Sequence, residues 1–152
     1  EAVTEVLAVD PATGARNRAA ARISDFARPV RWVALDGERL PLEDASVDTV
    51  VAAFTLCTIP DVEAALAEAR RVLKPSGQFR YLEHGLHPDP KVAVWQRRIE
   101  PVWKVLAGGC HLTRDADELV RAAGFDLVES EHHSMPGPRF STALYEGVAI
   151  PA

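Results

Sequence analysis

Two acidic residues stand where a short, mostly apolar stretch of the sequence ends. Asp10 follows the apolar run at residues 6–9, and Asp36, with Gly37 after it, closes a second stretch at 31–35. A carboxylate only accepts hydrogen bonds, so it suits the hydroxyl groups of a ribose or the amino group of a nucleobase. Each acid also fits a structural role in a turn or at a helix start, and Gly37 fits a simple turn.

Two histidines are candidates for acid–base chemistry. His84 follows Glu83 at the end of a predicted strand, and His111 lies two residues after the pair Gly108-Gly109. Because imidazole titrates near neutral pH, either ring could remove a proton from a bound substrate. We expect Glu83 and His84 to face a substrate pocket, with His84 as the better candidate base. The alternatives are a structural His84 bonded to backbone and a His111 in an ordinary loop.

The cysteines and histidines lack the close paired spacing of a zinc site. Cys57 and Cys110 form no CxxC motif, and Cys110-His111 stands alone. Adjacent His132 and His133 would point to opposite faces of a strand. We therefore expect no metal, and we interpret Cys57 as a small buried hydrophobic residue.

The composition limits the class of protein. The chain has 152 residues, 47% of them hydrophobic, which is enough for one domain with a core. Its net charge of −5 argues against nucleic acid as a partner. No stretch approaches the roughly 18 apolar residues of a membrane span, and two cysteines suit a reducing, cytoplasmic compartment. The sequence begins with Glu1, so a preceding segment could still carry a signal or an anchor.

The hydrophobic pattern alternates between strand and helix. A near-continuous apolar run at 6–9 indicates a strand buried on both faces, and residues 47–54 are predicted to form another buried strand. Asp61 is a predicted helix N-cap, Pro101 is predicted to kink or divide its helix, and Thr113 is the predicted cap of a short helix ending at Gly124. Strands are predicted at 6–9, 31–35, 47–54, 78–83, 125–132 and 142–150, with helices at 15–28, 61–74, 92–106 and 113–124. This order predicts an α/β, doubly wound, mainly parallel sheet with a C-terminal antiparallel hairpin.

Several motifs occur in a fixed order that resembles the class I S-adenosylmethionine-dependent methyltransferases, of the methyltransferase domain 11 type. They are VLAVDP, LDGERLPLEDASVDTVV and FTLCTIPDVEAALAEARRVLKPSGQFRYLEH, followed by the closing hairpin. The later pieces YLEHG and WQRRIEPVWKVLAGGCHLTRD resemble the thiol-methylating branch called methyltransferase-like seven. The similarity covers essentially the whole chain.

The resemblance implies a Rossmann-like fold, S-adenosylmethionine as cofactor and a set of contacts to it. Asp10 would hold the ribose and Pro11 would form part of the adenine wall. The adenine edge would be read at Asp36, Gly37 and Glu38, and the methionyl part would contact Phe54, Thr55 and Leu56. Trp95 and Trp103 would lie on a helix that covers the acceptor, with core packing as the alternative.

The resemblance also implies that residues 1–152 are a single, partial domain. EVLAVDP matches the second strand of the family, so the first strand and its glycine-rich turn would be lacking. In the family the first strand lies between the second and the fourth. We therefore expect two facing sheet edges with unpaired backbone groups, and an inactive segment when it stands alone.

The predicted function is transfer of a methyl group to a small, hydrophobic acceptor, with a thiol favoured. Such an in-line displacement needs the nucleophile held about 3 Å from the methyl carbon and little covalent help from the protein. The alternatives are a nicotinamide-dependent oxidoreductase and an inactive binding module. LDGERLP and RVLKPSG argue against the oxidoreductase. The sequence leaves the oligomeric state and the exact acceptor open.

Overall fold

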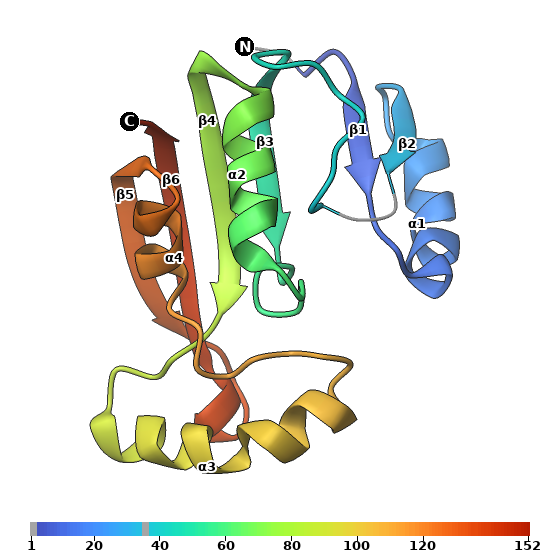
Figure 1. Cartoon of the computed structure of the whole chain (residues 1–152). Coiled ribbons are helices and arrows are strands. Elements are labelled where there is room, and N and C mark those ends of the chain that lie inside the picture. Colours follow the sequence, from blue (N-terminus) through green and yellow to red (C-terminus); the bar gives the residue numbers. More distant parts are fainter. Residues whose placement is uncertain (1–2, 35–36) are drawn as a thin grey trace.

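The computed structural model describes residues 3–34 and 37–152, which form six strands and four α-helices. An N-terminal unit contains β1 (Val6–Val9), α1 (Thr13–Asp25) and β2 (Val30–Ala34). The remaining elements are β3 (Val47–Ala53), α2 (Val62–Val72), β4 (Leu73–His84), α3 (Pro90–Leu106), α4 (Ala116–Ala122), β5 (Phe125–Ser134), a 3₁₀ turn (Arg139–Ser141) and β6 (Ala143–Pro151), as Figure 1 shows.

The strands form a two-stranded sheet, β1-β2, and a four-stranded sheet in the order β3-β4-β6-β5. The pairs β1/β2 and β3/β4 are parallel, while β6 runs antiparallel to both of its neighbours. In the β3/β4 pair Val50 lies opposite Phe79, and in the β4/β6 pair Tyr81 lies opposite Gly147. The predicted α/β fold with mostly parallel strands and an antiparallel C-terminal hairpin is confirmed. Within the described ranges, no strand pairing joins β1 to β3.

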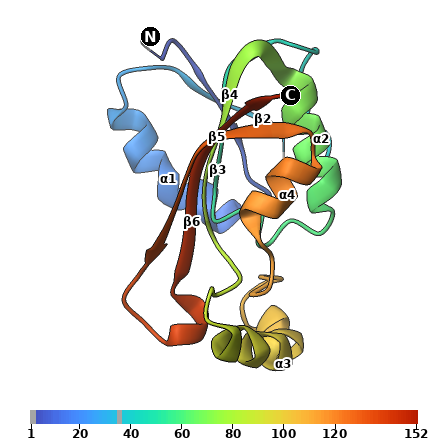
Figure 2. The same cartoon turned by 90° about the vertical axis from the view of Figure 1, so that its left-hand side faces the viewer.

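Helices lie on both sides of the strands (Figure 2), but only one face of the four-stranded sheet carries the hydrophobic core. The core forms where α2 and α4 pack on that face, around Leu66, Phe79 and Val120. On the other face Val51 is 69% exposed.

The predictions that the strand at 6–9 is buried on both faces and that the strand at 47–54 is buried are therefore wrong. In β1 no residue is buried, and in β3 only Ala52 is. Among the described residues, β1 belongs to a two-stranded sheet outside the core, and the core covers only one face of the sheet that contains β3.

Side-chain caps fix the starts of α2 and α4. Asp61 Oδ1 accepts a hydrogen bond from Ala64 N at 2.9 Å, as predicted. For α4 the cap is Asp115, which accepts from Glu118 N at 3.0 Å, so the prediction of Thr113 is wrong. Thr113 instead donates its backbone N–H to Glu100 Oε2 at 2.8 Å, which holds it against α3 before the helix begins.

Strand β4 begins at Leu73, directly after α2, and not at the predicted residue 78. Leu73 already pairs with Val47, so Pro75 and Gly77 lie inside the strand, where the register shifts. The helix does end before them, as the proline and glycine predict.

Helix α3 lies across the end of the sheet at which β4 terminates (Figure 1). It is one continuous helix, so Pro101 does not divide it. The fully buried Gln96 donates from Nε2 to the carbonyls of Gly85 at 3.0 Å and Phe140 at 2.9 Å, and accepts from His87 N at 2.8 Å. This amide fixes α3 to the end of β4 and to the β5–β6 connection. Among the described helices, none has the length and apolar character to cross a bilayer.

Candidate active site

Three parallel strands, β1, β3 and β4, end at the same side of the molecule (Figure 1). Asp10 follows β1, Phe54 and Thr55 follow β3, and His84 is the last residue of β4. In open α/β sheets ligands bind beyond the carboxyl ends of the strands. The fold therefore brings several of the predicted site residues to the edge where a ligand would bind.

The half-buried carboxylate of Asp10 has one oxygen engaged in the turn that leads to α1. Its Oδ1 accepts from Ala12 N at 2.7 Å. The second oxygen makes no hydrogen bond to the part of the chain that the structure describes, so it can accept from a ligand hydroxyl. Pro11 beside it is exposed. The turn role and the predicted ribose contact are therefore compatible.

The predicted adenine-reading segment lies close to the start of α2. Asp36 lies outside the described residues. A Cβ placed on Gly37 would lie 3.6 Å from Ile59 Cδ1, an ordinary packing distance. Glu38 Oε1 accepts from Asp61 N at 2.9 Å, so this carboxylate holds the start of α2. Its contact with a cofactor stays a prediction.

The loop after β3 exposes two of the three residues predicted to contact the methionyl part. Phe54 is 45% exposed and has φ +52°, in the left-handed region that residues other than glycine rarely adopt. Such backbone strain clusters at functional sites. Thr55 is also exposed, whereas Leu56 belongs to the hydrophobic core.

The loop at residues 54–60 is held from β4 by Glu83. Glu83 Oε1 accepts from Thr55 N at 2.7 Å and from Leu56 N at 2.9 Å, and Oε2 accepts from Cys57 N at 3.4 Å. Burial raises the pKa of this carboxyl, although the backbone N–H groups favour its ionised form. Glu83, predicted to bind substrate, thus has a positioning contact, and a direct contact with substrate stays a prediction.

Arg114 holds the same loop through its carbonyl groups, a role that the sequence analysis missed. Its guanidinium donates to the carbonyls of Leu56, Ile59 at 2.8 Å and Pro60 at 3.3 Å. A Cβ on Gly85, the residue after β4, would clash with the Arg114 carbonyl oxygen, so only glycine fits where the chain passes this residue. Glu83 holds the backbone N–H groups of the loop and Arg114 holds its carbonyl groups.

His84 is engaged with a thiol. Its Nε2 lies 2.8 Å from Cys110 Sγ, and this hydrogen bond raises the pKa of the His84 ring. A hydrogen bond with the Cys57 thiol lowers the pKa of Cys110, and the interaction with His84 adds to this effect. The same bond with Cys110, together with burial, raises the pKa of Cys57. A protonated His84 would be a poor base, so its role as a base stays a prediction.

His111, the second candidate base, lies beside the same cysteines. Its backbone N–H donates to the Cys57 carbonyl at 2.7 Å, and its Nδ1 lies 3.5 Å from Glu100 Oε1. Burial lowers the pKa of this ring, which favours the neutral form that a base requires.

The two tryptophans of α3 meet at Phe140, in the connection between β5 and β6. The ring centroids of Trp95 and Trp103 lie 5.7 Å and 5.3 Å from that of Phe140. Trp95 is exposed and, with Lys91, Val92, Arg139 and Phe140, lines a shallow hollow. Trp103 is half-buried. This arrangement supports packing for Trp103, and leaves Trp95 accessible to a ligand.

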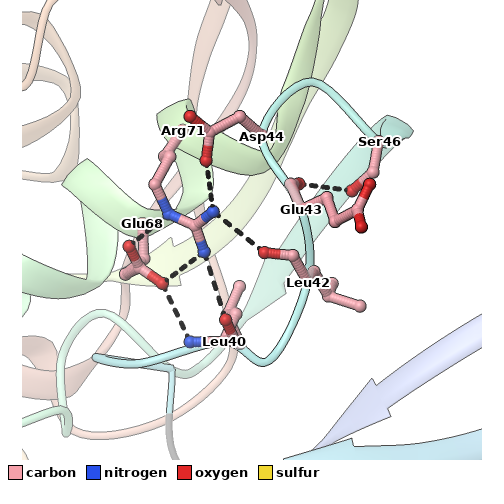
Figure 3. A network of polar contacts seen from close by, with 7 residues as sticks. All are labelled: Leu40, Leu42, Glu43, Asp44, Ser46, Glu68 and Arg71. Atoms are coloured by element: carbon pink, nitrogen blue, oxygen red, sulfur yellow. Dashed lines mark hydrogen bonds and ion pairs between the residues drawn. The ribbon is translucent and has the colours of Figure 1, made fainter.

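A second polar network holds the segment that precedes β3 (Figure 3). Arg71 donates to the carboxylates of Glu68 at 2.7 Å and Asp44 at 2.6 Å, and to the carbonyls of Leu42 at 2.9 Å and Leu40 at 3.1 Å. Arg71 thus ties the LPLED stretch to α2.

The fold and this edge define a Rossmann-like α/β domain with an acid and a held loop at the carboxyl ends of its parallel strands. Residues 1–81, more than half of the chain, match the family model described as a methyltransferase domain. The chain therefore belongs to this methyltransferase family.

Its relatives among curated proteins include thiol S-methyltransferases. The chain is 38% identical over 108 residues to thiol S-methyltransferase TMT1B of Rattus norvegicus, and 34% identical over 108 residues to TMT1A of Homo sapiens. Each match covers 70% of this chain and 44% of the relative, so the chain spans less than half the length of these relatives. The resemblance to the thiol-methylating branch is thereby confirmed.

Solved structures support the same fold. An S-adenosylmethionine-dependent methyltransferase of Methanosarcina mazei superimposes with a TM-score of 0.71 at 14% identity, over 97% of this chain and 82% of that one. The trans-methyltransferase CalH, in complex with S-adenosylhomocysteine, superimposes with a TM-score of 0.65 at 23% identity, over 95% of this chain and 42% of that one.

Proposed function

We propose that the complete polypeptide carrying this chain transfers a methyl group from S-adenosylmethionine to a small, hydrophobic acceptor, with a thiol favoured. The observation that carries the proposal is the position of Asp10 after β1 and Phe54 after β3, at strand ends on the same side of the molecule, in a chain of the methyltransferase family. The thiol preference follows from the similarity to thiol S-methyltransferases. The proposal includes a cytoplasmic location, because both cysteines are free and a reducing compartment keeps them so.

The residues at this edge fit the proposed cofactor. The Asp10 oxygen that has no partner within the described ranges can accept a hydrogen bond from the ribose. The exposed Phe54 ring offers an apolar surface to the methionyl part of the cofactor. When bound, the cofactor supplies a methyl group on a cationic sulfur, which an acceptor sulfur takes in line as the carbon–sulfur bond to the leaving thioether breaks. The contribution of this chain is positioning, because Glu83 and Arg114 hold the loop in one conformation before any ligand arrives.

Binding of the cofactor tests the first part of the proposal. Calorimetric titration of the complete polypeptide with S-adenosylmethionine should show saturable binding, and titration with NAD should show none. Asp10→Ala should weaken the binding by about tenfold or more, because a hydrogen bond to a charged group contributes roughly 1.5–3 kcal/mol. Asp25→Ala, an exposed acid at the end of α1, serves as the control and should leave the affinity unchanged.

Binding of NAD alone would favour the oxidoreductase, and binding of neither ligand would favour an inactive module. Either result would overturn the proposal. An affinity unchanged by Asp10→Ala would remove Asp10 from the site.

The acceptor is tested with a labelled methyl donor and a panel of small thiols, phenols and amines. We expect thiols to be methylated fastest. Turnover of phenols or amines with no turnover of any thiol would overturn the thiol preference and leave methyl transfer intact.

A further inference from the structure

Three side chains of types that bind soft metal ions meet near the carboxyl end of β4. Cys57 comes from the loop at 54–60, His84 from the last position of β4, and Cys110 from the segment after α3. Their ligand atoms all lie within 4.8 Å of one another. Cys57 is 3% and Cys110 7% exposed, so both thiols face the interior.

The backbone around the cluster holds all three residues in place. Glu83 and Arg114 fix the loop that carries Cys57, and the His111 N–H donates to the Cys57 carbonyl at 2.7 Å. Gly108 and Gly109 have φ values of +63° and +95°, a conformation that favours glycine, and they turn the chain after α3 so that Cys110 reaches the cluster. The arrangement is therefore ordered before any ligand binds, which is what a binding site requires.

Two buried polar atoms at the cluster are unexplained. His84 Nδ1 and Trp103 Nε1 are buried and have no hydrogen-bond partner among the described residues. Buried polar groups nearly always have partners, and an orphaned one often marks an unseen ion or water. The polar groups of His84 and Trp103 are therefore not fully satisfied by the described residues, which is consistent with an unseen group at the cluster.

We propose that Cys57, His84 and Cys110 bind a single thiophilic divalent cation of the Zn²⁺ class. Two thiolates and a neutral imidazole cancel the charge of such an ion, so the buried site carries no net charge. Thiolate and imidazole are the ligands that zinc prefers, and three protein ligands leave a fourth position for water or an added ligand.

The distances in the cluster are compatible with this assignment. Zn–S bonds of about 2.3 Å and Zn–N bonds of about 2.0–2.1 Å in a tetrahedron place ligand atoms roughly 3.5–3.8 Å apart. The His84 to Cys110 separation of 2.8 Å would widen and the longest separation, within 4.8 Å, would shorten.

The spacing of these residues in the sequence does not predict a metal site. Each ligand comes from a different element, and 26 residues separate His84 from Cys110. The proposal does not depend on methyl transfer, because metal binding is measured without a cofactor or an acceptor.

The test uses the complete polypeptide, prepared under reducing, anaerobic conditions and stripped of metal by a chelator. Titration with Zn²⁺ against a chromophoric competitor should show about one tight site per chain. Titration with Co²⁺ should give the visible absorption of tetrahedral cobalt with a thiolate-to-cobalt charge-transfer band. Addition of a small thiol should shift the visible bands if the fourth position is open.

Variants assign the site to its ligands. We expect each of three variants, Cys57→Ser, Cys110→Ser and His84→Asn, to weaken Zn²⁺ binding by more than 100-fold. Mutation of residues that only hydrogen-bond to metal ligands already lowers metal affinity by about 10–100-fold. His133→Gln, on the exposed part of β5, serves as the control and should bind like the parent. Circular dichroism identifies any variant that does not fold. If a cysteine variant does not fold, the Zn²⁺ affinity of His84→Asn, which keeps both thiols, decides whether the cluster binds the metal.

Each of four results would overturn the proposal. They are a Zn²⁺ affinity unchanged in all three variants, no metal binding by the parent, a disulfide between Cys57 and Cys110 in the anaerobic protein, and a Co²⁺ spectrum without thiolate charge-transfer bands.

Discussion

The two segments on either side of β3 are both held by charged side chains, but in different surroundings. Before β3, Arg71 holds residues 40–44 at the surface, where the Asp44 side chain is largely exposed (Figure 3). After β3, the loop at 54–60 is held by Glu83, which is 1% exposed, and by Arg114.

This difference explains what the family motifs do. In this chain Arg71 of the RVLKPSG motif bonds Leu42 and Asp44 of the LPLED stretch, so the two motifs are joined directly. The recognisable pair is thus a structural clamp. The loop at 54–60, in the candidate active site, is held instead by the buried carboxylate of Glu83 and by Arg114, which is distant from the loop in sequence.

The largest effect is expected from Glu83→Ala. The substitution removes the acceptor for three N–H groups, two of them in the buried residues Leu56 and Cys57, and each buried donor without a partner costs about 1–3 kcal/mol. We expect the free energy of unfolding to fall by about 3 kcal/mol or more. Denaturant unfolding measures the loss, with Glu129→Ala on the exposed part of β5 as the control.

Hydrogen exchange makes this prediction specific to the loop. The Thr55 and Leu56 amides should exchange faster in Glu83→Gln, which preserves the size of the side chain. Protection of these amides at the parent level would contradict the positioning role of Glu83.

A smaller loss is expected from Arg71→Met, because its partners are partly exposed to water and exposed ion pairs contribute little. The Leu40 amide, which donates to Glu68 Oε2 at 2.9 Å, should lose protection, while the Thr55 amide should not. Exchange monitored by NMR separates the two segments. Arg98→Met, on an exposed part of α3, is the control. Equal losses for Arg71→Met and Glu83→Ala would remove the contrast between surface and buried clamps.

The smallest effect concerns the pH dependence of the surface clamp. Hydrogen bonds from Arg71 and from the Leu40 N–H lower the pKa of Glu68 from 4.5 to about 2. Because the folded-state pKa is lowered, the stabilisation is complete above the unfolded value of 4.5 and is lost as the pH falls through about 2. The difference in unfolding free energy between the parent and Glu68→Gln should therefore shrink between about pH 5 and pH 2. Glu63→Gln, exposed on the same helix, should show no such trend.

Regular hydrophobic patterns predicted the order and type of the elements. The run at 6–9 became β1, the helical stripe after Asp61 became α2, and the closing hairpin formed as expected. Burial of β1 was not predictable from its residues, because burial depends on which elements pack against a strand. Thr113 and Asp115 are both good capping residues, and only the contact of Thr113 with Glu100 decided between them.

The site was predictable where it follows strand ends and unpredictable where it depends on convergence. Asp10 and Phe54 lie at the ends of strands that the apolar runs predicted, while their contacts with a cofactor, which the family resemblance implies, stay predictions. The contacts of Glu83 and Arg114 are to backbone groups, which leave no mark on the sequence of the loop. Cys57 looked like a core residue because nothing near it in sequence reveals His84 or Cys110.

The left-handed backbone of Phe54 sets stability against function at one position. For a residue with a side chain this conformation costs on the order of 1–2 kcal/mol, which glycine would avoid. The phenylalanine ring, being 45% exposed, recovers little of that by packing. Libraries randomised at residue 54 should therefore diverge, with thermal selection enriching glycine or asparagine and selection for ligand binding enriching aromatic residues.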